Sequence, residues 1–406
     1  MTQTLNPSQT LVSSVSATGT QVKTAISSID TLTGLRMIAA GVVYLAHLHV
    51  WRSYPDGFPI WLQTIMKHGY VGVLLFFTLS GFVICYTYFD RLETRFSSTW
   101  KSYFVARFAR IYPMYFLAFA LGVATAAVSN QKKPSLPVTL EWLTATQTWD
   151  RKIQVFDTYL TDFPGWSVGV EIFLYIAFPF LVFPILQRCK SIRSLVVLLG
   201  LANLIAFAVP TLFLITGFAS LSNGQSWSDP TYYLYYFPPT HLCAFVSGAA
   251  AARLYVRLKM YPVSKRENLL GSIALFVAIG GCIFLMMQNW NIWVFYSFNA
   301  ALLPFFTVTI FCLARYRNPI AWILSRRWAV LLGEASYSFY LLHFYVIYLN
   351  GDFLGKDSSS GKNFVYGLII FCLLLLTSLG CYTYYEMPMR KLIRRIALLR
   401  SSQETA

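Results

Sequence analysis

The sequence predicts an all-α protein that crosses a membrane about ten times, with both termini in the cytoplasm. Hydrophobic residues make up 56% of its 406 residues and charged residues only 12%, whereas roughly 25% of the residues in soluble globular chains are charged. Its mean hydropathy is +0.55. The apolar residues fall into stretches of about 20, the length that an α-helix needs to cross a bilayer. This composition excludes a soluble globular enzyme and predicts a polytopic integral membrane protein.

Ten apolar stretches are predicted to be transmembrane helices. Their expected bounds are 32–51, 70–89, 111–129, 168–187, 194–217, 235–256, 268–288, 292–314, 330–350 and 364–385. Residues 1–30 are rich in Ser and Thr and lack the apolar core of a signal peptide, so we expect a disordered polar tail there. The membrane domain is then expected over residues 31–391, followed by a basic C-terminal tail over residues 392–406.

The charges in the loops predict how these helices are oriented. Of the Lys and Arg residues in the loops and tails, 23 fall on the side that holds both termini and 8 on the opposite side. Because cytoplasmic loops of membrane proteins carry an excess of Lys and Arg, we expect both termini in the cytoplasm and the protein in the inner (plasma) membrane. The same rule accounts for the net charge of +16, so no nucleic-acid partner is inferred from that charge.

The first expected helix carries two ionisable side chains, which are costly in hydrocarbon. Arg36 and His47 are eleven residues apart, which is nearly three helical turns. They are therefore expected on one face of the helix, about 16 Å apart along its axis. With the N-terminus inside, Arg36 would lie near the cytoplasmic end and His47 in the outer half.

The remaining ionisable residues in the helices follow the same polarity. His241, His343 and Glu171 are expected toward the outer side, whereas Arg107 and Arg110 lie where the third helix leaves the cytoplasm. Arginine pairs well with phosphate oxygens, and imidazole titrates near neutral pH and suits a general base. The pattern predicts a phosphate-bearing donor at the inner end and chemistry at the outer end.

Structural roles are open for several of these residues. Arg107 and Arg110 also fit as anchors of the positive-inside rule, Arg36 as a side chain that snorkels to the interface, and His241 as a packing residue. The seven cysteines show no metal-type spacing. Most lie in apolar stretches, where cysteine packs as a small hydrophobic residue, so no metal site is predicted.

Four parts of the chain carry a resemblance to a known family. The first is RMIAAGVVYLAH, in which Arg36 is followed by ten residues and then His47. The others are GVLLFFTLSGF (72–82), RFARIYPMY (107–115) followed by WSVGVEIFLYIAFP (166–179), and LGEASYSFYLLHF (332–344) with YEMPMRK (385–391). With these motifs in this order across residues 31–391, the chain resembles the membrane-bound acyltransferase-3 family.

The resemblance implies transfer of an acyl group, usually acetyl, from cytoplasmic acyl-CoA to a hydroxyl group. The acceptors in this family are typically sugars of surface polysaccharides, lipopolysaccharides or glycolipids. Carried over by position, His47 is the expected catalytic histidine, and Arg36 is expected near the donor. The partners expected for the protein are thus the lipid bilayer, acetyl-CoA or another acyl-CoA, and a carbohydrate or other hydroxyl acceptor.

Further residues complete the expected site. With His47, the catalytic group is expected to include His343 and Glu171, where Glu171 would orient an imidazole as the carboxylate of a hydrolase triad does. Arg107 and Arg110 are expected to bind the donor together with Arg36. Four residues are expected near the substrate or the developing oxyanion: Ser80, Tyr337, Trp166 and His241. Direct attack by the acceptor competes with a covalent acyl-enzyme on His47 or a serine.

A different class of protein also fits some of these observations. Ten membrane spans with ionisable residues in mid-membrane suit a transporter, or a polysaccharide polymerase or flippase. A transporter favours Gly- or Pro-broken helices in paired positions of two repeated halves, which this sequence does not show. A polymerase has no need of an arginine cluster directed at a cytoplasmic nucleotide.

Overall fold

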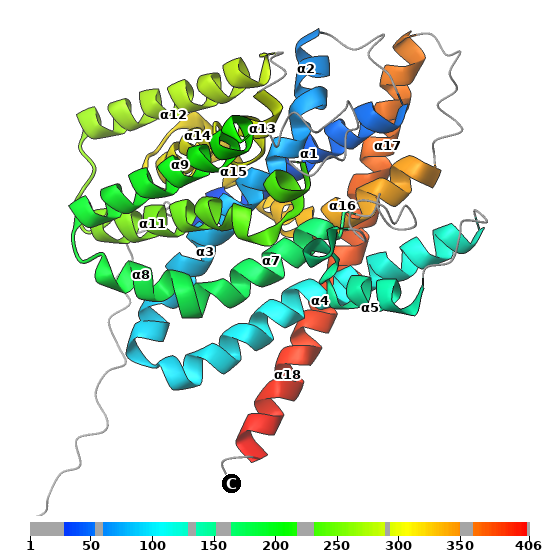
Figure 1. The fold of residues 1–406 in the computed structure, drawn as a ribbon, viewed down its shortest axis with the longest axis horizontal. Coiled ribbons are helices and arrows are strands. Elements are labelled where there is room, and N and C mark those ends of the chain that lie inside the picture. The colour runs from blue at the N-terminus through cyan, green and yellow to red at the C-terminus, as the bar shows by residue number, and fades with distance from the viewer. Residues whose placement is uncertain are drawn as a thin grey trace, which may run out of the picture.

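The computed structural model describes residues 28–52, 60–128, 135–151, 164–216, 231–288, 293–349 and 360–403. Every regular element within these ranges is helical, which confirms the all-α prediction, and the helices pack side by side in one bundle (Figure 1). Residues 1–27 of the expected polar tail lie outside the described residues.

In the described part of the chain, nine helical segments are long and apolar enough to cross a membrane. They fall on nine of the ten expected spans. The helices that form them are α1 (Ser28–Arg52), α3 (Gly72–Thr94), α4 (Phe96–Val128), α7 (Trp166–Ala177) with α8 (Phe183–Arg188), α9 (Ile192–Ile215), α12 (Lys265–Met286), α13 (Trp293–Asn299) with α14 (Leu303–Arg315), α16 (Arg327–Leu349), and α17 (Ser360–Cys381) with α18 (Met387–Gln403). Shorter helices connect them: α2 (Ile60–His68), α5 (Leu136–Thr144) and α15 (Pro319–Leu324).

The tenth expected span, 235–256, differs from the other nine. Its α-helix, α11, covers only the 17 residues Leu242–Leu258. The segment before it forms a π-helical turn, Tyr232–Tyr236, and a 3-10 turn, Pro238–His241. Two consecutive prolines lack the backbone N–H that an α-helix needs, so the regular helix begins only after them.

Glycines allow the central helices to approach closely. A Cβ atom on Gly81 of α3 would lie 2.0 Å from the carbonyl oxygen of Phe245 on α11, and one on Gly248 of α11 would lie 1.9 Å from that of Thr78 on α3. In the same way α16 meets α1 at Gly333. Small residues let helix backbones pack tightly inside membranes. The close packing thus joins α3 to α11 and α1 to α16. Helices α1, α3 and α16 carry most of the candidate site.

The outer helices are apolar all round. In α3 and α14 about 78% of the most apolar stretch is buried, but in α9 only 22% and in α12 only 28%. Apolar side chains that are exposed on the outside of the bundle are solvated by lipid tails. We therefore expect α9 and α12 to face lipid. Figure 1 shows α12 along one edge of the bundle.

Candidate active site

A cavity of about 60 Å³ lies between α1, α3, α4, α7 and α16. This is enough room for a few water molecules. Its wall includes five residues that the sequence predicted for the site, and each comes from a different helix: Arg36, Ser80, Arg110, Glu171 and Tyr337. The structure therefore brings together residues that the sequence separates by up to about 300 positions.

The two ends of the cavity differ in chemistry. At one end, which we call the tyrosine end, the hydroxyls of Ser167 on α7 and Tyr340 on α16 are hydrogen-bonded at 2.7 Å. Ser167 donates its one proton to the carbonyl oxygen of Pro164 at 3.0 Å, so Tyr340 is the donor to Ser167. One turn further along α7, Glu171 interacts electrostatically with Arg36 and Arg110. These three residues form the arginine end.

The arginines at this end have no direct counter-ion. The side chains of Arg36 and Arg110 are half-buried because they face the cavity. Neither forms a hydrogen bond or an ion pair with any residue in the described ranges. A charge held away from water is costly unless it is paired. The arginine end is therefore suited to an anionic ligand.

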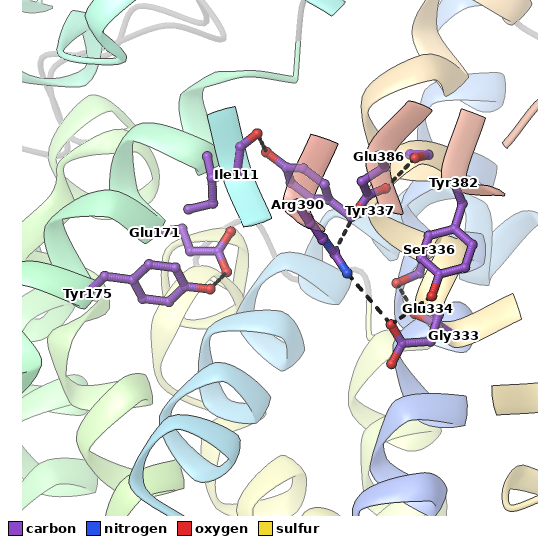
Figure 2. A network of polar contacts seen from close by, with 11 residues as sticks. Ile111, Glu171, Tyr175, Gly333, Glu334, Ser336, Tyr337, Tyr382, Glu386 and Arg390 are labelled. Atoms are coloured by element: carbon purple, nitrogen blue, oxygen red, sulfur yellow. Dashed lines mark hydrogen bonds and ion pairs between the residues drawn. The ribbon is translucent and has the colours of Figure 1, made fainter. Parts of the chain in front are cut away.

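The neighbouring acidic groups are engaged elsewhere, as Figure 2 shows. Glu386 is fully buried, accepts a hydrogen bond of 2.6 Å from Ser338 and pairs with Arg390. A carboxylate oxygen of Glu334 lies 3.8 Å from the same arginine and accepts a hydrogen bond of 3.4 Å from Tyr382. Arg390 thus pairs with both carboxylates. Neither of these two glutamates forms an ion pair with Arg36 or Arg110.

The polar region formed by the arginine end, Arg107 and the Arg390 cluster contains more positive than negative side chains. Glu171 accepts a short hydrogen bond from Tyr175, as Figure 2 also shows. Arg107 does not line the cavity, and its guanidinium lies 5.3–5.9 Å from the ring centroids of Tyr88, Tyr103 and Tyr175. Its buried Nε has no partner among the described residues. The region holds four arginines and three glutamates, so a bound anion would balance its charge.

The imidazoles of His47 and His343 lie against each other, with ring centroids 4.7 Å apart. Nδ1 of His47 lies 3.0 Å from the carbonyl oxygen of Val43, and Nδ1 of His343 makes a short hydrogen bond to that of Tyr340. A carbonyl oxygen only accepts, so in each neutral ring the proton sits on Nδ1 and Nε2 carries the lone pair. Nε2 of His343 is buried and has no partner among the described residues. Each ring can therefore act as a base through Nε2.

Tyr340 stands between the cavity and the histidines. Its side chain lines the tyrosine end, and its ring centroid lies 5.6 Å from that of His343. His47 and His343 themselves do not line the cavity. Glu171 lies with the arginines rather than with His47, because α7 runs antiparallel to α16 and carries Glu171 away from the tyrosine end. Backbone carbonyls, and not Glu171, orient the imidazoles.

The other predicted residues lie around these groups. The hydroxyl of Tyr337 donates to the carbonyl oxygen of Ile111 at 3.0 Å. The rings of Trp166 and His241 pack in an aromatic cluster outside the cavity wall, where the ring centroid of His241 lies 4.7 Å from that of Phe77. Nε2 of His241 is 2.8 Å from the carbonyl oxygen of Tyr235. Both rings therefore pack beside the cavity and do not line it.

Sequence reasoning missed several residues of this region: Ser167, Glu334, Tyr340, Glu386 and Arg390. A signal was present for the two glutamates, because a carboxylate in an apolar helix faces a cavity or a partner. The same argument had singled out Glu171. For Ser167 and Tyr340 no comparable signal exists, since hydroxyl residues are common in membrane helices. Among the residues described, no group of three or more His, Cys, Asp or Glu side chains is arranged to hold a metal ion.

Comparisons with known proteins give the family. The acyltransferase domain family matches residues 29–385. The chain is 26% identical to "Acyltransferase MdmB" of Streptomyces mycarofaciens, over 81% of each chain. It is 23% identical to a "Putative O-acetyltransferase" of Staphylococcus aureus, over 89% of this chain and 57% of the relative.

A third relative is longer than this chain as well. The chain is 23% identical to "Peptidoglycan O-acetyltransferase OatA" of Listeria monocytogenes, over 80% of this chain and 50% of the relative. It thus spans about half the length of the two O-acetyltransferases that it matches. No solved structure matches it. The extent of the family match, together with the motifs and the helical bundle, shows that this protein is a multi-pass membrane acyltransferase of the acyltransferase-3 family.

Proposed function

We propose that this acyltransferase moves an acyl group, expected to be acetyl, from cytoplasmic acyl-CoA to a hydroxyl group of a carbohydrate. One observation carries the proposal. Arg36 and Arg110, which have no counter-ion among the described residues, line a cavity whose opposite end adjoins two imidazoles with available Nε2 atoms. The arrangement combines an anion site and a general base, which is what transfer from a phosphate-bearing donor needs.

The donor would lie with its phosphates at the arginine end. Guanidinium groups bind phosphate oxygens through charge-assisted hydrogen bonds. Along α3 the cavity wall extends from Val73 to Ser80, seven residues or about 10 Å at the rise of an α-helix. The pantetheine arm of acyl-CoA is a slender chain long enough for this distance, and it would carry the thioester toward Tyr340. Because the cavity has room for only a few water molecules, the helices around it would have to move apart to admit the arm.

The chemistry would be general-base catalysis by His47. Its Nε2 takes the proton from the acceptor hydroxyl, and the oxygen attacks the thioester carbonyl. His343 packs against His47 and keeps its own proton on Nδ1, which faces a carbonyl oxygen. The acceptor approaches from the histidine side, so the two substrates meet at the tyrosine end from opposite directions.

The names of the relatives support the acceptor class. Two are named O-acetyltransferases, and the name of one of them states peptidoglycan, a carbohydrate polymer, as its acceptor. By analogy, we propose that the acceptor of this protein is a carbohydrate of the cell surface. With both termini in the cytoplasm, the arginine end faces the compartment that contains acyl-CoA, and the inner (plasma) membrane is the proposed location.

Transfer from labelled donor tests the proposal. Membranes that contain the protein are incubated with ¹³C-acetyl-CoA, and extracted glycans and glycolipids are analysed by mass spectrometry. We expect labelled O-acetyl groups that alkali removes and that membranes with the His47→Ala variant fail to form. If neither glycans nor glycolipids gain label while the protein is folded and binds the donor, a carbohydrate acceptor is wrong.

A further inference from the structure

A second cavity, of about 460 Å³, lies between α1, α2 and α17, and we call it the α1–α17 groove. We propose that this groove binds the hydrocarbon tail of a lipid-linked acceptor, whose hydroxyl-bearing head group then lies beside His47. The inference rests on the proposed function and names the class of acceptor, which is a sugar on a lipid anchor rather than a free soluble sugar.

The lining of the groove is apolar. Ten of its eleven residues are aliphatic side chains, a phenylalanine or glycines, and the eleventh is Tyr44. The hydroxyl of Tyr44 donates its one proton to the carbonyl oxygen of Gly367 at 3.2 Å. A ligand with amides, phosphates or sugar hydroxyls would lose its hydrogen bonds with water here and gain none in return. The groove therefore suits a hydrocarbon chain and not the pantetheine arm of the donor, which carries amides.

The groove opens on the outside of the bundle. At its rim, Ile38 of α1 is 48% exposed and Leu368 of α17 is 54% exposed. Both residues belong to helical segments that are long and apolar enough to cross a membrane, so the opening faces hydrocarbon. A lipid tail can enter it sideways from the bilayer, whereas a soluble sugar would have to leave water to reach it.

The length of the groove matches one leaflet of a bilayer. Along α1 its lining residues run from Met37 to Leu48, eleven residues or about 16 Å at the rise of an α-helix. The hydrocarbon core of a bilayer is about 30 Å thick, so one leaflet provides about 15 Å. The membrane segment of α1 covers Ile29–Leu48, and the groove thus follows its second half, which also carries His47. A tail in the groove belongs to a lipid of that leaflet.

An aromatic layer places the groove next to the histidine pair. The ring centroid of Tyr44 in the groove wall lies 5.9 Å from that of Phe339 and 5.5 Å from that of Phe371. Tyr44 precedes His47 by three residues on α1, and Phe339 precedes His343 by four residues on α16, which is about one turn in each helix. The groove therefore ends at the level of the imidazoles, and this is where the head group of a lipid in the groove would emerge.

Gly41 keeps the groove open. A Cβ atom on Gly41 would meet no atom within 4 Å, whereas one on Gly34, seven residues earlier on α1, would lie 2.2 Å from the carbonyl oxygen of Leu324. Helix packing thus accounts for Gly34 but not for Gly41. Glycine weakens a helix interior relative to alanine. At Gly41 the missing side chain leaves space for a tail, and a larger residue would fill that space without displacing protein atoms.

Gly41→Leu and Gly200→Leu form a matched pair for testing the groove. At both positions a Cβ meets nothing within 4 Å, but Gly41 lines the groove and Gly200 lies on the exposed face of α9. Membranes with each variant receive ¹³C-acetyl-CoA, and solvent partition separates lipid-linked from water-soluble products for mass spectrometry.

We expect alkali-labile label on lipid-linked products of the wild type. Gly41→Leu should lower this label about tenfold or more, because a filled groove excludes the tail as an overpacked core excludes a side chain. Gly200→Leu should keep it within about twofold, as surface substitutions usually do. Label confined to water-soluble products, or equal label in the two variants, would overturn the inference.

Photo-crosslinking reports occupancy of the groove without turnover. Purified full-length protein in phospholipid nanodiscs is irradiated with a dodecyl glucoside that carries a diazirine in its alkyl chain, and mass spectrometry identifies the modified residues. We expect modification at the groove residues of α1 and α17, lost in Gly41→Leu and kept in Gly200→Leu. If Gly41→Leu does not fold, the wild-type crosslinks and the partition of the wild-type label decide.

The remaining outcomes separate the inference from the proposed function. If the groove is crosslinked but Gly41→Leu transfers acetyl to lipid as the wild type does, the groove holds a structural lipid and the inference is wrong. If Gly41→Leu loses only transfer from dodecanoyl-CoA, the groove holds the acyl chain of the donor, and the assignment to the acceptor is wrong. Absence of any labelled carbohydrate in the wild type would instead refute the proposed function.

Discussion

The imidazole rings of His47 and His343 meet edge to face, at 63° and with centroids 4.7 Å apart, although about 300 residues separate them in the chain. Each Nδ1 faces a backbone carbonyl oxygen. Two imidazolium ions at this separation would repel each other in a site of low polarity, so the pair can take up one proton at a time. In the proposed mechanism the pair acts as a single general base with a neutral neighbour.

Replacement of His47 tests that role. We expect His47→Ala to lower acyl transfer about 10²–10⁴-fold, the usual contribution of a general base. Donor affinity and thermal stability should stay close to those of the wild type, because the donor phosphates are proposed to bind at the other end of the cavity. Turnover, acetyl-CoA calorimetry and thermal unfolding are measured on the same preparation. Residual turnover above about a tenth of wild type would show that another group takes the proton.

The arginine end predicts a different kinetic effect. Arg36→Gln and Arg110→Gln should each weaken acyl-CoA binding about tenfold or more, since a hydrogen bond to a charged group contributes roughly 1.5–3 kcal/mol. The KM of the acceptor should change less. Arg107→Gln should have a smaller effect on donor binding, because Arg107 lies among tyrosine rings and outside the cavity wall.

Arg253→Gln is the matched control for the arginine variants. Its guanidinium already pairs at 2.7 Å with Asp90, whose side chain is exposed. Calorimetry with acetyl-CoA and with CoA should give unchanged affinity for this variant. If Arg36→Gln and Arg110→Gln also bind the donor as the wild type does, these arginines only anchor helices and another basic group must hold the phosphates.

Helix packing predicts opposite effects for two Gly→Ala changes. A Cβ at Gly248 would lie 1.9 Å from the Thr78 carbonyl oxygen, whereas a Cβ at Gly200 of α9 meets nothing within 4 Å. Gly248→Ala should separate α3 from α11 and destabilise the protein by about 1–3 kcal/mol, as overpacking does. Gly200→Ala should be neutral or stabilise it by up to about 1 kcal/mol, since alanine favours the helix. Thermal unfolding in detergent measures both, and equal effects would contradict the close packing of α3 and α11.

The count of Lys and Arg residues in the loops predicts on which side of the membrane each loop lies. A cysteine in place of Leu136, which is exposed, should react with a membrane-impermeant maleimide from outside intact cells. A cysteine in place of Tyr261, also exposed, should react only after the membrane is opened. Wild-type protein, with its seven cysteines, measures the background. Reaction of both positions from the same side would refute the orientation and the entry of the donor from the cytoplasm.

The length of the apolar stretches was enough to predict most of the membrane helices. The bilayer requires about 20 apolar residues per crossing, so nine of the expected spans coincide with helices of the structure. Prediction was less successful at 235–256, where Pro238 and Pro239 shorten α11. Proline acts on a few backbone hydrogen bonds and barely changes the average hydropathy of a stretch, so hydropathy alone overlooks it.

The sequence by itself determined the family, the all-α membrane fold and the opposite placing of arginines and histidines along the helices. The family follows from the resemblance of the motifs and their order along the chain. The fold and the placing of the ionisable residues follow from local quantities, namely hydrophobic length and residue spacing within one helix. It determined less about Glu171, which was expected with the histidines and lies with the arginines.

Only the tertiary structure decided which side chains meet. The pairing of His47 with His343, the commitment of Glu334 and Glu386 to Arg390, and the place of Tyr340 at the end of the cavity all depend on the rotation and direction of helices that are distant in sequence. Those are set by close contacts such as Gly333 against Thr33. Helix rotation in a bilayer depends on packing between neighbours and not on hydropathy, because lipid solvates any apolar face equally well.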